Sequence, residues 1–188
     1  MSTDAEIVRA SLSEPWRFAE LYERHARVIH RYAGRRLGVS AADDITSETF
    51  LVAFDKRATF DPTIGDARPW LLGIATVLTR KYRRLEARSW LAVQHGERDP
   101  TDHTLDDALE RMDAGQQVAA LASAIRRLSA SDRDTLLLLA WGDLDHAGIA
   151  AALGIPVGTV KSRLNRIRRK LATPLPEQRT EGDIGWTA

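Results

Sequence analysis

The stretch from Leu144 to Leu171 constrains the fold more tightly than any other part of the chain, because one helical pattern ends and another begins within three residues. Apolar residues up to Leu153 predict a short helix. Gly154 can end that helix, since glycine readily adopts the left-handed conformation found at helix C-termini. Pro156 suits the first turn of the next helix, where its missing N–H is not needed. The pattern predicts two helices joined by a tight turn.

The second predicted helix has one apolar face and one basic face. Its apolar residues recur at steps of three and four, at Val157, Val160, Leu164, Ile167 and Leu171. At about 100° per residue, the opposite face carries a polar set, namely Ser162, Asn165, Arg166 and Arg169. Residues 156–172 contain six Lys or Arg residues and no acid. Two helices, a glycine turn and a basic outer face are typical of a helix-turn-helix that binds duplex DNA.

A solvated helical hairpin and a helix lying on a membrane surface are the alternatives to DNA binding. Solvated faces usually mix charges of both signs, whereas this face is basic throughout. Membrane-surface helices usually carry large apolar residues, whereas this apolar face is partly β-branched. DNA binding is therefore the favoured interpretation.

Charges are distributed unevenly along the chain, although the net charge is only +1. Residues 1–88 carry 15 basic and 12 acidic side chains, residues 89–125 carry 2 and 7, and residues 126–172 carry 9 and 4. The acidic stretch has few large apolar residues, which is typical of a linker, and its charge would also suit a basic groove. We therefore predict two domains, at residues 1–88 and 118–172, joined by a flexible acidic linker at 89–117. A disordered tail is predicted at residues 173–188.

The remaining sequence predicts helices and no strands. One helical pattern runs from Phe18 to Tyr32 and can end at Gly38, and another is expected over about residues 41–56. A turn-rich loop at 58–68 precedes a third helix, whose apolar stripe is Leu71, Ile74, Leu78, Tyr82 and Leu85. The predicted fold is therefore all-α, with two small helical domains and the helix-turn-helix in the C-terminal one.

The helix after the loop carries a second basic surface suited to nucleic acid. Arg80, Arg83 and Arg84 point away from its apolar stripe, while Trp70 and Val77 lie at the edge of that stripe. Basic side chains neutralise phosphates, and aromatic side chains stack on unpaired bases. The alternative is a packed tryptophan with a solvated basic rim. A separate DNA-binding module in the same chain favours nucleic-acid binding.

Asp43, Asp44 and Glu48 form an acidic cluster at helical spacing. Carboxylates on one helical face can bind a hard cation, but the sequence has no second such motif and no phosphate-binding glycine loop. A helix-start cap or a charged docking face is favoured over a metal site. No histidine has a zinc-binding spacing, and no serine lies in a nucleophile-elbow context. We therefore predict no catalytic residue, no metal and no cofactor.

The chain contains no cysteine, which excludes disulfides and fits a reducing compartment. No apolar run approaches the length of a membrane span, and the N-terminal residues lack the apolar core of a signal peptide. A cytoplasmic protein without membrane insertion is expected.

Four segments stand out in order along the chain: FAELYERHARVIHRYAGRRLG, DDITSETFLVAFDKR, FDPTIGDARPWLLGIATVLTRKYRR, and LSASDRD followed by LGIPVGTVKSRLNRIRRKL. Together they resemble a bacterial RNA polymerase sigma factor of the extracytoplasmic-function (ECF) class, in the sigma-70 family. The resemblance implies a transcription initiation factor that docks on core RNA polymerase, melts the minus-ten promoter element and reads the minus-thirty-five element. Polymerase, and not this chain, would perform the chemistry.

The resemblance also implies roles for individual residues. Polymerase docking falls on Asp44, Glu48 and Phe50, and the loop at 58–68 matches one that captures a flipped base of the non-template strand. Contacts to the downstream element are assigned to Trp70, Val77, Arg80, Lys81, Arg83 and Arg84. Contacts to the upstream element are assigned to Thr159, Lys161, Ser162, Arg163, Asn165, Arg166 and Arg169. The acidic linker matches a segment that threads towards the polymerase active centre.

Two residues depart from the pattern of that family. Many relatives carry glutamine where this chain has Ser47, and asparagine where it has Val77. A valine side chain cannot hydrogen-bond a base. We therefore expect an unusual or relaxed preference at the minus-ten element.

The expected partners are core RNA polymerase, promoter DNA as duplex and as non-template single strand, and a cognate anti-sigma protein. The alternative function is a conventional helix-turn-helix regulator whose N-terminal domain senses a signal or dimerises. Such a regulator binds duplex DNA without polymerase, whereas a sigma factor needs core enzyme for strong, salt-sensitive promoter binding.

Overall fold

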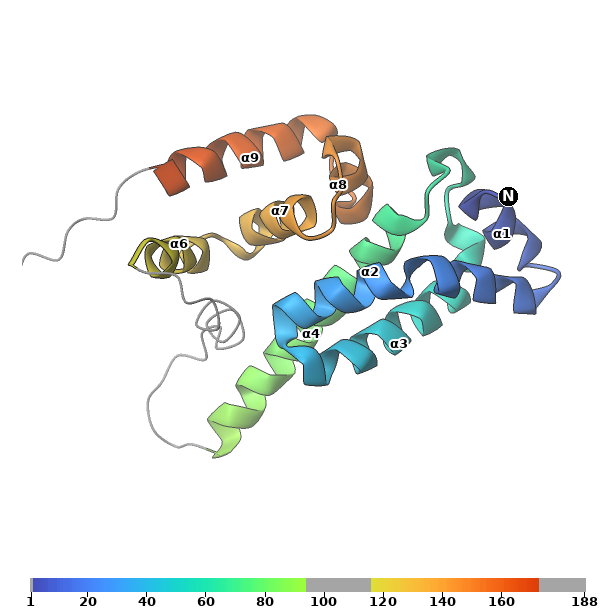
Figure 1. Ribbon diagram of the computed structural model, residues 1–188, viewed down its shortest axis with the longest axis horizontal. Coiled ribbons are helices and arrows are strands. Elements are labelled where there is room, and N and C mark those ends of the chain that lie inside the picture. Colours follow the sequence, from blue (N-terminus) through green and yellow to red (C-terminus); the bar gives the residue numbers. More distant parts are fainter. Residues whose placement is uncertain (1, 94–115, 173–188) are drawn as a thin grey trace, which may run out of the picture.

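The structure is a computed structural model that describes residues 2–93 and 116–172 (Figure 1). Every regular element in these two ranges is helical, which confirms the predicted all-α fold. The elements are α1 (Asp4–Ala10), η1 (Pro15–Phe18), α2 (Ala19–Leu37), α3 (Val39–Asp55), η2 (Arg57–Thr59), η3 (Pro62–Ile64), α4 (Arg68–Val93), α6 (Gln116–Arg126), α7 (Ala130–Ala140), α8 (His146–Leu153) and α9 (Val157–Ala172). Most of the predicted linker and all of the predicted tail lie outside the described residues.

Helices α1 to α4 form the N-terminal domain, in which α2, α3 and α4 pack against one another (Figure 1). Gly38 makes the sharp turn between α2 and α3 with a φ of 84°, a conformation that residues with a side chain rarely adopt. Four residues at the predicted helical steps are fully buried in the core, namely Leu21, Ile29, Tyr32 and Leu71. Tyr22, on the same predicted face, is 48% exposed.

Helices α6 to α9 form the C-terminal domain, and α8 with α9 is the predicted helix-turn-helix. Gly154 ends α8 in the left-handed conformation, with φ 63° and ψ 39°, as the sequence predicts. Asp145 caps the start of α8, because its carboxylate accepts a hydrogen bond from the Gly148 N–H at 2.7 Å. Val160 and Ile167 bury the apolar face of α9, so its basic face is turned outwards.

The two domains pack directly against each other, which the sequence does not predict. Helix α8 lies against the first half of α4 (Figure 1). A Cβ atom placed on Gly73 of α4 would collide with the carbonyl oxygen of Ala152 in α8, so a glycine is what permits this approach. Buried apolar side chains of both domains belong to one continuous core, among them Leu71, Leu72, Leu138 and Ile149.

Helix α4 is longer than predicted and continues to Val93, inside the predicted linker. Leu85, predicted to belong to the apolar stripe of this helix, is 54% exposed. The reason is that the C-terminal part of α4 extends beyond the helices it packs against (Figure 1). None of the described helices is long and apolar enough to span a membrane.

Candidate nucleic-acid interface

Helix α9 presents most of the predicted upstream-element contacts on its outer face. Five of these side chains are exposed and two are half-buried, the exposed ones being Lys161, Ser162, Asn165, Arg166 and Arg169 and the half-buried ones Thr159 and Arg163. The tight turn at Gly154 fixes the angle between α8 and α9, so this face projects as one surface. Its separation from the buried stripe agrees with the predicted periodicity.

Arg166 is already engaged within the C-terminal domain. Its guanidinium binds both carboxylate oxygens of Asp132 on α7, and the Lys170 ammonium lies 3.4 Å from the same carboxylate. The hydrogen bond from Arg166 is the main reason that the pKa of Asp132 is lowered below its ordinary value, while burial acts in the opposite direction. Asp132 therefore sets the position of Arg166 at the edge of the outer face of α9. A contact of Arg166 with a DNA base stays a prediction.

A groove of about 590 Å³ runs beside the outer face of α9, between α7, α8 and α9. Its floor is mainly apolar, and Lys161, Asn165 and Arg168 are among the residues that line it. Two of the predicted base readers thus border both the DNA-facing surface and this groove. Sequence patterns do not reveal the groove, because it forms only where three helices meet.

Helix α4 places the predicted downstream contacts in different environments. Val77 is 61% exposed, and Lys81 and Arg84 are also exposed. Trp70 is half-buried, and its ring packs 5.2 Å from the ring of Phe60, which precedes η3. Trp70 therefore supports the loop ahead of α4, and stacking of its ring on an unpaired base stays a prediction.

Helix α3 presents an acidic outer face. Asp44 and Glu48 are exposed, and Glu48 lies 3.8 Å from Lys81 of α4. Phe50 is 6% exposed and packs edge-on against Tyr22, with the two ring centroids 4.7 Å apart. Phe50 thus lies in the core beneath this face, and a direct contact of its side chain with polymerase stays a prediction.

Leu51 is an exposed apolar residue on the same helix, which sequence reasoning missed. Its side chain is 62% exposed, next to the buried Phe50. An apolar residue within a helical pattern is usually assigned to the core. The available signal was that Leu51 stands one helical turn after the polar Ser47, on the acidic face.

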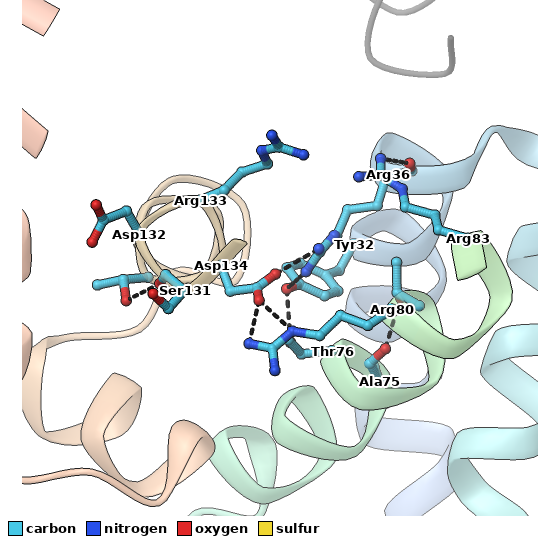
Figure 2. A network of polar contacts seen from close by, with 12 residues as sticks. Tyr32, Arg36, Ala75, Thr76, Arg80, Arg83, Ser131, Asp132, Arg133 and Asp134 are labelled. Carbon is cyan, nitrogen blue, oxygen red and sulfur yellow. Dashed lines mark hydrogen bonds and ion pairs between the residues drawn. The ribbon is translucent and has the colours of Figure 1, made fainter. Parts of the chain in front are cut away.

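A buried polar network, which no sequence pattern indicates, joins the two domains (Figure 2). Asp134 of α7 is 1% exposed, and its carboxylate binds Arg36 of α2 and Arg80 of α4. The Arg36 Nη2 atom lies 2.6 Å from Asp134 Oδ1, and the Arg80 Nε–H donates to Oδ2 at 2.5 Å. One acidic side chain of the C-terminal domain thus holds two arginines of the N-terminal domain.

The N-terminal domain itself orients Arg36 within this network. Arg36 is 2% exposed, and its Nη1–H donates to the Tyr32 hydroxyl at 2.7 Å. The Tyr32 hydroxyl lies 2.8 Å from Thr76 Oγ1, whose own O–H donates to the Leu72 carbonyl. Burial works against the charge of Arg36, but Tyr32 and Asp134 raise the pKa of its guanidinium above the ordinary value. Arg36 is therefore a fixed, charged donor.

Asp4 of α1 joins three segments of the N-terminal domain. Its carboxylate accepts a hydrogen bond from the Ala67 N–H at 3.0 Å, pairs with Arg24 at 3.0 Å and lies 2.6 Å from His25 Nε2. Possible ligand atoms of Asp4, His25 and Asp66 lie within 4.8 Å of one another, but donors of the protein already occupy Asp4. We therefore assign this cluster to packing, where it fixes the loop that leads into α4.

Asp4→Asn is expected to lower the free energy of unfolding at pH 7 by about 1–2 kcal/mol, because it removes charge-assisted hydrogen bonds. Burial alone would raise the pKa of Asp4, but the hydrogen bonds from Ala67, His25 and Arg24 outweigh it and lower the pKa. Stability from a carboxyl with a lowered pKa is present above its ordinary pKa and is lost as the pH falls through the folded-state value.

Urea unfolding of wild type and Asp4→Asn should therefore converge as the pH is lowered from 7 to below about 4, the ordinary pKa of an aspartate. Glu23→Gln, which changes an exposed carboxylate on α2, is the control and should leave stability nearly unchanged at both pH values. A difference between wild type and Asp4→Asn that stays constant with pH would contradict this role of the carboxylate.

Comparison with known proteins identifies both domains. The family model for sigma-70 region 2 matches residues 21–89, and the model for sigma-70 region 4 matches residues 118–171. The ECF RNA polymerase sigma factor SigL of Mycobacterium tuberculosis is 32% identical over 178 residues, covering 92% of this chain and 97% of SigL. The ECF RNA polymerase sigma factor BldN of Streptomyces coelicolor is 32% identical over 179 residues, covering 91% of this chain and 65% of BldN.

Solved structures have the same fold. CnrH, in complex with the cytosolic domain of CnrY, gives a TM-score of 0.57 at 23% identity, covering 90% of this chain and 95% of that one. The sigma factor RpoE of Bartonella quintana, in complex with the anti-sigma factor NepR, gives a TM-score of 0.55 at 19% identity, covering 82% and 93%. These likenesses establish the fold, and the extent of the match to SigL establishes the family. The chain belongs to the ECF RNA polymerase sigma factors of the sigma-70 family, which are transcription initiation factors.

Proposed function

We propose that the two domains divide promoter recognition between them, with α9 reading the minus-thirty-five element and α4 contacting and melting the minus-ten element. The observation that carries the proposal is the outer face of α9, which is basic, exposed and set at a fixed angle by the turn at Gly154. A helix of this kind fits the major groove, where side chains distinguish all four base pairs. Asn165 suits bidentate pairing with adenine, and Arg163 suits guanine.

The downstream half of the proposal rests on the exposed side chains of α4. Lys81 and Arg84 can neutralise phosphates, and the loop at 58–68, held by Asp4 and Trp70, is positioned to receive an extruded base. Flipping a base costs a few kcal/mol of stacking and pairing energy, which capture of that base must offset. Val77 offers no hydrogen bond at this surface, so we expect shape and stacking to dominate the minus-ten preference.

The outer face of α3 is the proposed docking surface for core RNA polymerase. Asp44 and Glu48 provide exposed negative charge, and Leu51 adds an exposed apolar contact between them and the end of the helix. Charged contacts steer association and apolar contacts supply much of the affinity. Phe50 would act indirectly, because its ring packs against Tyr22 of α2 and so holds α3 in position.

A cognate anti-sigma protein is a further proposed partner. Both of the solved structures described above are complexes, CnrH with the cytosolic domain of CnrY and RpoE with NepR. By analogy, a protein that covers the exposed faces of α3 or α9 would keep this factor from polymerase or promoter. The two faces are the surfaces on which such a partner would act.

Retention of core RNA polymerase on the immobilised factor, followed by transcription from a library of random promoters, tests the proposed function. We expect retention, and initiation from a set of promoters that share two elements. A conventional regulator would bind duplex DNA without polymerase and would initiate nowhere. Loss of both retention and initiation would overturn the proposal.

Asn165→Ala should relax promoter preference at one or two positions of the upstream element. The expected loss of discrimination is about 1–3 kcal/mol, the contribution of one bidentate contact to a base edge. Sequencing of promoters selected from the library by wild-type and variant holoenzymes measures this change. Arg127→Ala, at an exposed position after α6 and outside the predicted readers, is the control. An unchanged profile for Asn165→Ala would remove this residue from the readers.

A further inference from the structure

The arginine pair of the N-terminal domain has the features of an anion-binding site. Arg36 and Arg80 come from different helices of one domain, yet both guanidiniums converge on a single carboxylate (Figure 2). The Tyr32 hydroxyl accepts a hydrogen bond from Arg36 at 2.7 Å, and Thr76 Oγ1 lies 2.8 Å from that hydroxyl and holds it in place. Because these supports belong to the N-terminal domain, Arg36 does not depend on Asp134 alone for its position.

The occupant of the site comes from the other domain. Asp134 lies on α7, and its carboxylate is the one acidic group that the described contacts place between the two arginines. Arginine forks bind phosphate oxygens with the same geometry as carboxylate oxygens. The chemical class that could replace Asp134 is therefore a phosphodiester.

The location of the site on α4 points to promoter DNA as the source of that phosphodiester. Arg80 stands one position before Lys81, and one turn before the exposed Arg84. Both residues belong to the surface proposed above to contact the minus-ten element. A DNA strand on this surface would pass close to Arg80, whose guanidinium binds Asp134, and Asp134 is 1% exposed while the domains are packed together.

We propose that Arg36 and Arg80 form a phosphodiester-binding site, which Asp134 occupies while the two domains are packed together and which promoter DNA takes when they separate. The inference rests on the proposed function and adds to it a buried contact residue, Arg36, and a competitor, Asp134. In the closed factor the carboxylate excludes the DNA backbone from the site. In the factor bound to polymerase and promoter, a phosphate replaces the carboxylate, and this exchange favours the separated arrangement.

Promoter binding by the holoenzyme at several salt concentrations tests the site. Each phosphate contact that is lost lowers the slope of log K against log salt by about 1. Arg36→Gln is expected to weaken binding roughly tenfold and to lower the slope by about that amount. Arg27→Gln is the matched control, since Arg27 is exposed and lies nine residues earlier, on the opposite face of α2. Equal affinity and equal slope for Arg36→Gln and wild type would overturn the site.

Asp134→Asn tests the competition without changing the site itself. This variant keeps the shape of the side chain and removes its charge, so the free factor should bind a fluorescent promoter duplex roughly tenfold more tightly than wild type. The combined Asp134→Asn, Arg36→Gln variant should lose that gain. An Asp134→Asn variant with wild-type affinity would refute the competition, and this measurement decides alone if Arg36→Gln does not fold.

The same assays separate failure of the inference from failure of the proposed function. If the wild-type holoenzyme initiates at no promoter, the proposed function is wrong and the inference falls with it. If the wild-type holoenzyme initiates and the Arg36 and Asp134 variants behave like wild type in both binding assays, only the phosphodiester site is wrong.

Discussion

Replacing Gly73 with alanine is expected to separate the two domains and to lower the free energy of unfolding by up to about 3 kcal/mol, the upper part of the range for overpacking. The added Cβ would collide with the Ala152 carbonyl oxygen and would lie 3.2 Å from the carbonyl carbon. Both atoms belong to the backbone of α8, so no side chain can rotate to make room. The whole helix has to move away from α4.

Small-angle scattering of the free factor and urea unfolding measure the two effects of Gly73→Ala. Gly158→Ala is the matched control, because a Cβ on Gly158 of α9 would meet no atom within 4 Å. That control should be neutral or slightly more stable, since alanine favours a helix by about 1 kcal/mol over glycine. Unchanged dimensions and stability for Gly73→Ala would mean that α4 and α8 do not approach this closely in solution.

Gly73→Ala also exposes the arginine pair by a route that leaves every charge in place. If Asp134 excludes DNA only because the domains are packed, moving α8 should raise the affinity of the free factor for promoter duplex, as is expected for Asp134→Asn. Gly73→Ala would then act by steric repulsion and Asp134→Asn by loss of a charge, and both would raise the affinity for DNA. Agreement between a steric and an electrostatic change would tie the DNA affinity of the free factor to domain separation itself.

Local sequence signals were sufficient for the helix-turn-helix. Gly154 ends one helix and Pro156 precedes the next, and the apolar stripe of α9 is visible as steps of three and four residues. These features depend on neighbours in the sequence, so periodicity and capping rules apply directly. The predicted separation of apolar and basic faces on α9 holds for the same reason.

The domain contact depended on residues far apart in the sequence, and local rules do not reach such pairs. Arg36 stands near a helix end beside a glycine turn, where arginines are usually solvated. Gly73 lies within a helical pattern, and an interior glycine can mark a close backbone approach, but nothing in the sequence names Ala152 as its neighbour. The same holds for Phe50. The family resemblance implies a docking role for this residue, but it does not reveal that the ring packs against Tyr22 of α2.

Asp134→Leu is expected to destabilise the factor by about 3–5 kcal/mol, since it removes a buried carboxylate that binds the buried Arg36. Adding Arg36→Met should recover most of that loss, because well-packed apolar residues often replace a buried ion pair without cost. Arg80 is half-exposed, with 38% of its side chain accessible, and can turn to solvent in both variants. Urea unfolding of wild type, both single variants and the double variant measures the coupling between the two positions.

The double variant, Asp134→Leu with Arg36→Met, separates a structural role of the ion pair from a functional one. It should be folded and closed, yet as holoenzyme it should bind promoter less tightly than wild type and with a smaller salt slope, because a methionine side chain offers no donor to a phosphate. A double variant that is stable and binds promoter like wild type would mean that the pair serves only to hold the domains together. A stable double variant with weakened binding would mean that a buried charge at Arg36 is retained for DNA, since an apolar contact in its place is sufficient for the fold.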